Sequence, residues 1–342
     1  MLPSHLMDSS LRKNEPRRQI RLGEMPPAPP PSLCITGAMS RVGRFEPSPG
    51  ISLAYTIFRP RQLLDDRKPP LIVCHGGPSI PSNYLLPIVN GVTDRAIVFY
   101  DMWGCGKSSR PARMTNTPFS IPKMVEHLQG LIKHWNVNEF HLFGHSFGGI
   151  LAYEYLKKER TGCLSLLLGS TPTSPKLIQR ECFRLDQEIR NTANASIVST
   201  NSVDNDEAAE KEEETKLKQP QRFSEAFLQT HECRLPALPL VLTDALAQAG
   251  PPGWRGAPAI IDYEALEPLS GIPTLVLVGE YDFCTPTCTE GWKTIISDPS
   301  PEFFALENCS HYGMLEDESK YGIAITSFVQ QHDDAPSKRA VV

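Results

Sequence analysis

Short runs of apolar residues alternate with helical patterns over most of this 342-residue chain. Residues 51–58 alternate apolar and polar positions, which predicts a half-buried strand. Other short runs are mostly apolar and predict buried strands at residues 71–74, 96–100, 140–143, 164–168 and 274–278. Between them, residues 121–135 and 149–159 carry the spacing of amphipathic helices. This alternation predicts an α/β fold in which helices cover both faces of a mostly parallel sheet.

The pattern changes at both ends of the chain and once in its interior. Residues 1–40 are polar and rich in proline, so we expect a disordered extension there. Residues 176–262 lack strand patterns and contain the charged run 204–218, which predicts an inserted helical cap with a solvated insertion. Further helical pieces are predicted at residues 177–190, 223–235 and 321–331. The predicted order is an extension (1–40), the first part of the core (41–175), the cap (176–262), the second part of the core (263–332) and a disordered tail (333–342).

Composition excludes several classes of function. The net charge of −5 comes without a basic patch, so no nucleic-acid partner is expected. No apolar run is long enough to cross a bilayer, and the N-terminus lacks the apolar core of a secretory signal. Nine cysteines are scattered singly, which is typical of reduced thiols in a cytoplasmic protein.

Ser146 is the strongest candidate for a catalytic residue. It lies in Gly144-His-Ser-Phe-Gly148, directly after the apolar run 140–143 and just before a helical pattern. A Gly-x-Ser-x-Gly motif between a strand and a helix forms a nucleophile elbow, in which the serine occupies a strained turn. Glycine is needed on both sides because the turn leaves no room for larger side chains.

Two further residues complete a catalytic triad in the order serine, acid, histidine. Asp282 follows the predicted strand 274–278, and His311 follows another strand at residues 302–306. Both side chains are therefore expected at the carboxyl edge of the sheet, beside Ser146. In this arrangement the histidine accepts the serine proton and the aspartate orients the histidine.

An oxyanion hole is expected next to this triad. One donor is the backbone N–H of Phe147, directly after the nucleophile. The second is expected in the His75-Gly-Gly-Pro-Ser loop after the first buried strand, from Gly77 or, as the second choice, from Gly76.

No cofactor or metal is predicted. Cys284 and Cys288 lie near Asp282 in the sequence, but their spacing is not that of a zinc site and the triad accounts for Asp282. The segment that begins at Gly104 lacks the first glycine of a phosphate-binding loop.

Taken together, these motifs resemble those of proline iminopeptidases, within the α/β-hydrolase superfamily. The resemblance covers residues 42–330 apart from the charged insertion. The segments that carry it are His75-Gly-Gly-Pro, Asp101-Met-Trp-Gly-Cys-Gly-Lys-Ser, Gly144-His-Ser-Phe-Gly-Gly, His231-Glu-Cys-Arg-Leu-Pro and residues 272–282.

The resemblance implies a serine hydrolase with a helical cap that removes an N-terminal residue, often proline, from short peptides. The substrate would be a small molecule or short peptide, bound without a cofactor. Contacts to it are expected from His75, Trp103, Trp254 and Phe283.

Two positions depart from that family's pattern. Such aminopeptidases hold the substrate ammonium with one carboxylate in the cap and one directly after the triad aspartate, because a buried unpaired charge is unstable. Here those positions are Gly253 and Phe283. Glu232 or Glu264 are candidates to replace the missing carboxylates. The substrate is therefore either an aminoacyl amide or peptide, or a non-peptide ester, lactone or amide of the kind that relatives in secondary metabolism hydrolyse.

A non-catalytic binding protein on a hydrolase fold is a third alternative. It would be favoured by a broken triad, since a fold alone does not determine a function. The sequence retains all three triad residues, which favours an enzyme.

Overall fold

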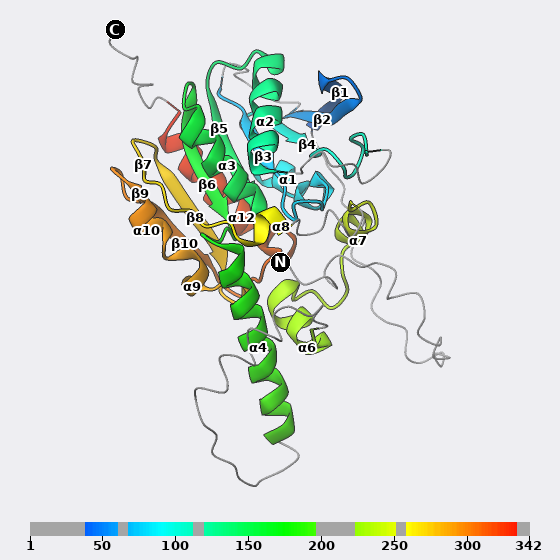
Figure 1. The fold of residues 1–342 in the computed structure, drawn as a ribbon, viewed down its shortest axis with the longest axis vertical. Helices are drawn as coiled ribbons and strands as arrows, with labels where there is room; N and C mark the ends of the chain where they lie inside the picture. The colour runs from blue at the N-terminus through cyan, green and yellow to red at the C-terminus, as the bar shows by residue number, and fades with distance from the viewer. Residues whose placement is uncertain (1–37, 61–67, 112–119, 196–222, 251–257, 334–342) are drawn as a thin grey trace.

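The computed structural model describes residues 38–60, 68–111, 120–195, 223–250 and 258–333 (Figure 1). Several predictions lie outside these residues: the extension up to residue 37, the charged run 204–218, the tail from residue 334, Gly253 and Trp254. The structure does describe residues 38–40, which were assigned to the extension, as the start of a strand.

Within the described residues, the central sheet has eight strands in the order β1-β2-β4-β3-β5-β6-β8-β10. β1 and β2 pair antiparallel, as do β2 and β4, whereas all other neighbours pair parallel. The strands are β1 (Ala38–Ser48), β2 (Ile51–Pro60), β3 (Leu71–Cys74), β4 (Ile97–Tyr100), β5 (Phe140–His145), β6 (Cys163–Gly169), β8 (Thr274–Gly279) and β10 (Glu302–Leu306). A separate short pair joins β7 (Leu269–Ser270) and β9 (Ile296–Ser297).

Every strand predicted from the sequence is confirmed; these are β2, β3, β4, β5, β6, β8 and β10. β1 was not predicted. It is an edge strand that pairs only with β2, and most of its side chains are exposed. Only Gly43, Phe45 and Pro47 in its second half share a half-buried face, so the sequence carries too little apolar alternation to indicate a strand.

Helices cover both faces of the sheet, as the alternating pattern predicted (Figure 1). α2 (Ile121–Trp135) and α3 (Phe147–Lys158) pack on one face, and α1 (Ile88–Gly91) and α12 (Glu318–Gln331) pack on the other. The Ser120 side chain caps the start of α2, and Asn136 ends it in a left-handed conformation with φ of 53°.

A set of helices lies between β6 and β7, in the region predicted to be a cap (Figure 1). We call it the helical insertion, residues 175–261. It contains α4 (Pro175–Ala195), α6 (Glu225–Phe227), the π-helical turn η4 (Leu228–Glu232), α7 (Leu240–Ala247) and α8 (Pro258–Ile261). The remaining short elements are the 3₁₀ turn η3 (Ser82–Leu85), α9 (Pro286–Thr289), α10 (Trp292–Ile295) and α11 (Gly313–Glu316).

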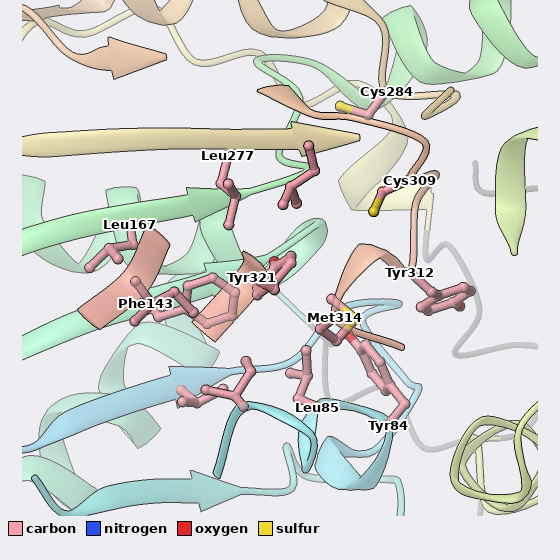
Figure 2. Close-up of a cluster of buried hydrophobic side chains, with 14 of the residues drawn as sticks. Tyr84, Leu85, Phe143, Leu167, Leu277, Cys284, Cys309, Tyr312, Met314 and Tyr321 are labelled. Atoms are coloured by element: carbon pink, nitrogen blue, oxygen red, sulfur yellow. The ribbon is translucent and has the colours of Figure 1, made fainter. Parts of the chain in front are cut away.

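One apolar core fills the space between the sheet and α12 and continues to the carboxyl ends of the strands (Figure 2). Phe143 and Leu277 contribute from the strands, and Tyr321 contributes from α12. The same cluster includes Tyr84 and Tyr312, which lie at the carboxyl edge. Apolar packing therefore supports the loops at this edge directly.

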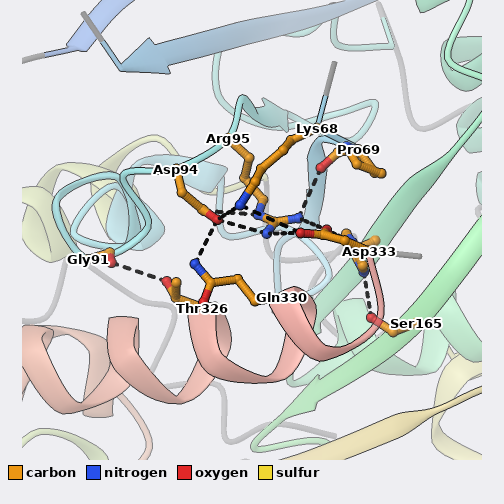
Figure 3. A network of polar contacts seen from close by, with 10 residues as sticks. Lys68, Pro69, Gly91, Asp94, Arg95, Ser165, Thr326, Gln330 and Asp333 are labelled. Atoms are coloured by element: carbon orange, nitrogen blue, oxygen red, sulfur yellow. Dashed lines mark hydrogen bonds and ion pairs between the residues drawn. The ribbon is translucent and has the colours of Figure 1, made fainter. Parts of the chain in front are cut away.

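A polar network joins the C-terminal end of α12 to the amino-terminal ends of β4 and β5 (Figure 3). Arg95 is fully buried and donates to both Asp94 and Asp333, at 2.9 Å and 2.6 Å. His141, on β5, contacts Asp333 through Nε2 at 3.1 Å and Ser165 through Nδ1 at 2.7 Å. Asp333 was assigned to the disordered tail, but here it is a partner for two buried groups.

We expect Asp333→Ala to lower the free energy of unfolding by roughly 2–4 kcal/mol, because it removes one partner from a buried guanidinium. Asp94 still pairs with Arg95 in this variant, which limits the loss. Urea denaturation measures the effect. The matched control is Asp262→Ala, which breaks an exposed pair with Lys176 and should change stability by less than about 1 kcal/mol. Equal losses in the two variants would contradict this assignment.

Stability should also fall in mild acid because of His141. Burial, together with the nearby Arg95 charge, lowers the pKa of His141 from 6.5 to about 4. The folded protein therefore favours neutral His141, and this contribution is complete above pH 6.5 and lost as the pH falls towards 4. Between pH 7 and pH 5 we expect it to remove roughly 1–2 kcal/mol of unfolding free energy. A His141→Gln variant should show a pH dependence smaller by that amount, and an unchanged pH dependence would refute the explanation.

Candidate active site

Ser146 occupies the sharp turn between β5 and α3. Its backbone has φ of 55° and ψ of −122°, a conformation that is strained for a residue with a side chain. The Ser146 N–H donates to the carbonyl of Gly169 on the neighbouring strand β6, at 2.7 Å. The turn therefore holds the serine at the carboxyl end of a central strand.

The glycines of the motif are required by close backbone approach. A side chain at Gly144 would overlap the carbonyl of Gly148, and one at Gly148 would overlap the carbonyl of Cys74 on β3. These obstacles are main-chain atoms, which cannot move aside as a flexible side chain can.

Asp282 and His311 come together as the sequence predicted. They follow the adjacent parallel strands β8 and β10, and Nδ1 of His311 lies 2.9 Å from a carboxylate oxygen of Asp282. The backbone N–H of Cys284 donates to the same oxygen at 2.8 Å. Burial raises the pKa of Asp282, but the adjacent His311 and these hydrogen bonds outweigh it and hold the pKa below its usual value. Asp282 is therefore a carboxylate at neutral pH.

His311 lies close to the elbow. The imidazole rings of His145 and His311 have centroids 4.9 Å apart, and His145 directly precedes Ser146. Phe283 covers one face of the His311 ring, with centroids 4.0 Å apart and planes inclined by 23°. Phe283 is fully buried, so its ring restricts His311 from one side.

The two glycines proposed as oxyanion donors differ. The Gly76 N–H donates to the hydroxyl of Tyr84 at 2.8 Å, so it is already used. Among the described residues, none accepts a hydrogen bond from the N–H of Gly77, which has φ of 114°. Phe147 is the first residue of α3, where the N–H has no acceptor within the helix. Gly77 and Phe147 are therefore the available donors, and Gly76 is not.

Comparison with known proteins agrees with this geometry. The family model described as alpha/beta hydrolase fold matches residues 69–318, more than half of the chain. The chain belongs to the α/β-hydrolase fold family. It is 28% identical over 284 residues to the proline iminopeptidase of Lactobacillus crispatus (strain ST1), covering 78% of this chain and 92% of the relative. The similarity to proline iminopeptidases predicted from the motifs is thus confirmed, and it supports a hydrolase activity.

Solved structures show the same fold. The proline iminopeptidase of Mycobacterium smegmatis has a TM-score of 0.70 and 22% identity, covering 86% of this chain and 99% of that one. A proline iminopeptidase-related protein from Thermus thermophilus has a TM-score of 0.63 and 18% identity, covering 86% and 98%.

A narrow apolar pocket of about 30 Å³ adjoins Ser146 in this hydrolase. The helical insertion contributes Pro175, Ile178, Ile260 and Ile261 to it. The core contributes the remaining lining residues, which are Gly77, Pro78, Ser146, Phe147, Ile150 and Pro172. None of these described lining residues carries a charge.

The residues predicted to contact substrate are placed differently. His75 is fully buried; its Nδ1 bonds the carbonyl of Gly76, and its Nε2 accepts from the N–H of Met102, both at 2.9 Å. Both ring nitrogens therefore stabilise the loop. Trp103 lies in the apolar core, with its ring edge-on to His127. Neither His75 nor Trp103 lines the pocket at Ser146. Phe283 contacts His311 instead. Trp254 is outside the described residues.

The helical insertion also bonds to the loops that carry Asp282 and His311, and the sequence did not reveal these contacts. The carbonyls of His231 and Glu232 accept from the N–H groups of His311 and Tyr312, at 3.3 Å and 3.2 Å. Nδ1 of His231 bonds the carbonyl of Tyr281 at 2.7 Å, and the Arg234 guanidinium lies 3.8 Å from the centre of the Tyr281 ring. The resemblance to proline iminopeptidases identified the segment that begins at His231 as a motif. Its contacts with Tyr281, His311 and Tyr312 are visible only in the folded structure.

The two candidate replacements for the missing carboxylates are also distinguished. Glu232 is buried next to these contacts, 2% exposed, whereas Glu264 is exposed. Burial beside the loops that carry Asp282 and His311 makes Glu232 the better-placed of the two.

Other features bear on cofactors and membranes. No group of three or more His, Cys, Asp or Glu side chains arranged to hold a metal ion is found in the described part of the chain. The cysteines there, Cys284 and Cys288 included, are free thiols. None of the helices in the described ranges has the length and apolarity needed to span a bilayer.

We expect Gly148→Ala to lower the free energy of unfolding by roughly 1–3 kcal/mol, because its methyl group would meet the Cys74 carbonyl. Thermal or urea denaturation of the purified variant measures the loss. Gly291→Ala is a suitable control, since Gly291 has φ of −55° and the nearest atoms are those of the Thr173 side chain. It should change stability by less than about 1 kcal/mol. A Gly148→Ala protein as stable as this control would be inconsistent with the steric explanation.

Proposed function

We propose that this protein is a serine hydrolase that cleaves an amide or ester bond of a small substrate through an acyl-enzyme at Ser146. The observation that carries the proposal is the contact between His311 and Asp282 at 2.9 Å, beside a serine in a strained elbow. Strain at a buried serine is typical of a functional site, since folding alone would favour a relaxed turn.

The proposed reaction begins when Ser146 Oγ attacks the substrate carbonyl and its proton passes to Nε2 of His311. Asp282 accepts the hydrogen bond from Nδ1–H and stabilises the imidazolium that forms. The N–H groups of Gly77 and Phe147 donate to the oxyanion of the tetrahedral intermediate. His311 then protonates the leaving group, and water attacks the acyl-enzyme by the same steps to release the acid.

Two substrate classes compete within this proposal. The similarity to proline iminopeptidases favours an aminoacyl amide or short peptide as the substrate. A non-peptide ester, lactone or amide is favoured by a specific observation, the apolar lining of the pocket at Ser146. Phe283, where resemblance leads us to expect an amine-binding carboxylate, supports the second class as well. A non-catalytic binding role accounts for neither the strained serine nor the buried Asp282–His311 pair.

A fluorophosphonate probe should label the wild-type protein and fail to label Ser146→Ala. Hydrolysis of p-nitrophenyl butyrate should fall about 10⁴-fold or more in Ser146→Ala and in His311→Ala, because triad members act as a unit. Ser297→Ala, which changes an exposed serine on β9, is the control and should match wild type. Labelling that persists in Ser146→Ala would place the nucleophile elsewhere and refute the proposal.

The substrate class is decided by a separate comparison of proline p-nitroanilide with p-nitrophenyl butyrate. Turnover of the ester without cleavage of the aminoacyl amide would exclude the aminopeptidase. Efficient release of proline would instead exclude a pocket restricted to uncharged groups.

A further inference from the structure

A buried hydrogen-bonded chain runs behind the candidate nucleophile. Its first member is the Gly76 N–H, which donates to the Tyr84 hydroxyl at 2.8 Å. Tyr84 in turn contacts Nδ1 of His145 at 2.9 Å, and Nε2 of His145 contacts the carbonyl of His311 at 2.9 Å. Tyr84 and His145 are both about 1% exposed, so water does not compete for these bonds.

The direction of every bond in this chain is determined. The His311 carbonyl can only accept, so Nε2 of His145 carries a proton. Burial, together with the neighbouring His311, lowers the pKa of His145 to about 3, so its ring is neutral and Nδ1 is an acceptor. The Tyr84 hydroxyl therefore accepts from Gly76 and donates to His145. All donors and acceptors along the chain are satisfied, as buried polar groups require.

These hydrogen bonds connect the three segments that the proposed reaction uses. Gly76 belongs to the loop that carries Gly77, and a β-carbon built at Gly76 would lie 3.0 Å from Cβ of Ser146. His145 directly precedes Ser146, and the His311 carbonyl belongs to the proposed base. Tyr84, from η3, thus fixes the oxyanion loop and His145 relative to one another.

Resting on the proposed function above, we propose that Tyr84 and His145 are positioning residues for the oxyanion hole. By occupying the Gly76 N–H, Tyr84 makes the next amide, that of Gly77, the donor presented to the substrate. By holding the His311 carbonyl, His145 sets the proposed base at a fixed distance from the elbow. Errors of about 1 Å in such geometry can reduce rates about 10²-fold, so these bonds matter for catalysis.

Packing alone does not explain the Tyr84 hydroxyl. Tyr321 is a matched case, because it belongs to the same buried cluster (Figure 2) and is about 2% exposed. Among the described residues, its hydroxyl has no hydrogen-bond partner. The two tyrosines therefore separate the effect of a ring in the core from the effect of a hydroxyl in the chain.

The test compares Tyr84→Phe with Tyr321→Phe, using p-nitrophenyl butyrate as the probe substrate. Tyr84→Phe should lower kcat about 10- to 100-fold with KM changed less than about twofold, since one oxyanion donor contributes about 10²- to 10³-fold and here it is displaced rather than removed. Tyr321→Phe should leave kcat and KM as in wild type. Thermal denaturation of both variants checks that they remain folded at the assay temperature.

A transition-state analogue gives a readout that a purely structural role would not move. An aliphatic trifluoromethyl ketone forms a bond from Ser146 Oγ to its carbonyl carbon; the Oγ proton passes to Nε2 of His311, and the carbonyl oxygen becomes an oxyanion. Its affinity should fall in Tyr84→Phe by the same factor as kcat/KM. His145→Gln, which offers both an acceptor and a donor, should retain more activity than His145→Leu.

The outcomes distinguish the two proposals. If wild type is labelled by the fluorophosphonate but Tyr84→Phe keeps full kcat and full affinity for the ketone, the positioning role is wrong and the serine hydrolase stands. A loss that appears equally in Tyr321→Phe would also overturn it, since the effect would then come from the core. If wild type itself is not labelled, the proposed function fails before Tyr84 is considered.

Discussion

The conformation of Ser146 is the constraint on which the rest of the site depends. A residue with a side chain at φ of 55° and ψ of −122° costs on the order of 1–3 kcal/mol, and packing around it has to offset that cost. The offset comes from a turn in which β5, α3 and the end of β3 approach so closely that Gly144 and Gly148 have no room for a β-carbon. Any relaxation of this turn would also shift the N–H of Phe147, which belongs to the same turn.

The parallel sheet brings the other two candidate catalytic residues together beside this turn. β8 and β10 are in register beside each other, so the loops that follow them emerge together and bring Asp282 to His311. Loops alone would not hold that contact, and two connections restrain them. His231 of the helical insertion bonds Tyr281 and His311, and His145 of the elbow bonds His311 from the other side. The proposed base is thus held by the insertion and by His145 at the end of β5, next to Ser146.

Much of this could be predicted from the sequence, for a physical reason. Strands buried on both faces of a parallel sheet are mostly apolar, so β3, β5 and β8 can be recognised as short apolar runs. Ser146 and Asp282 follow such runs within three residues, and His311 follows the edge strand β10. What could not be predicted depends on contacts between residues far apart in the chain. The bond from Tyr84 to His145 spans 61 positions, and nothing local to either residue indicates it. The sequence ranked Gly77 ahead of Gly76 as an oxyanion donor, but it gave no sign that the Tyr84 hydroxyl occupies the Gly76 N–H.

The residues proposed to perform the reaction and the residues that line the pocket lie in different parts of this hydrolase. The core holds the elbow, the Asp282–His311 pair and the Tyr84–His145 hydrogen bonds. Their geometry does not depend on which acyl group a substrate would carry. The pocket that would meet that group takes Ile178, Ile260 and Ile261 from the helical insertion. An ammonium brought into such a lining would need a counter-charge, because desolvating it unpaired costs several kcal/mol. Phe283 cannot supply one, and its ring instead adds to the apolar surroundings of His311. Under the proposed function, a change of substrate class would therefore involve the insertion and Phe283, while the residues proposed to perform the reaction stay as they are.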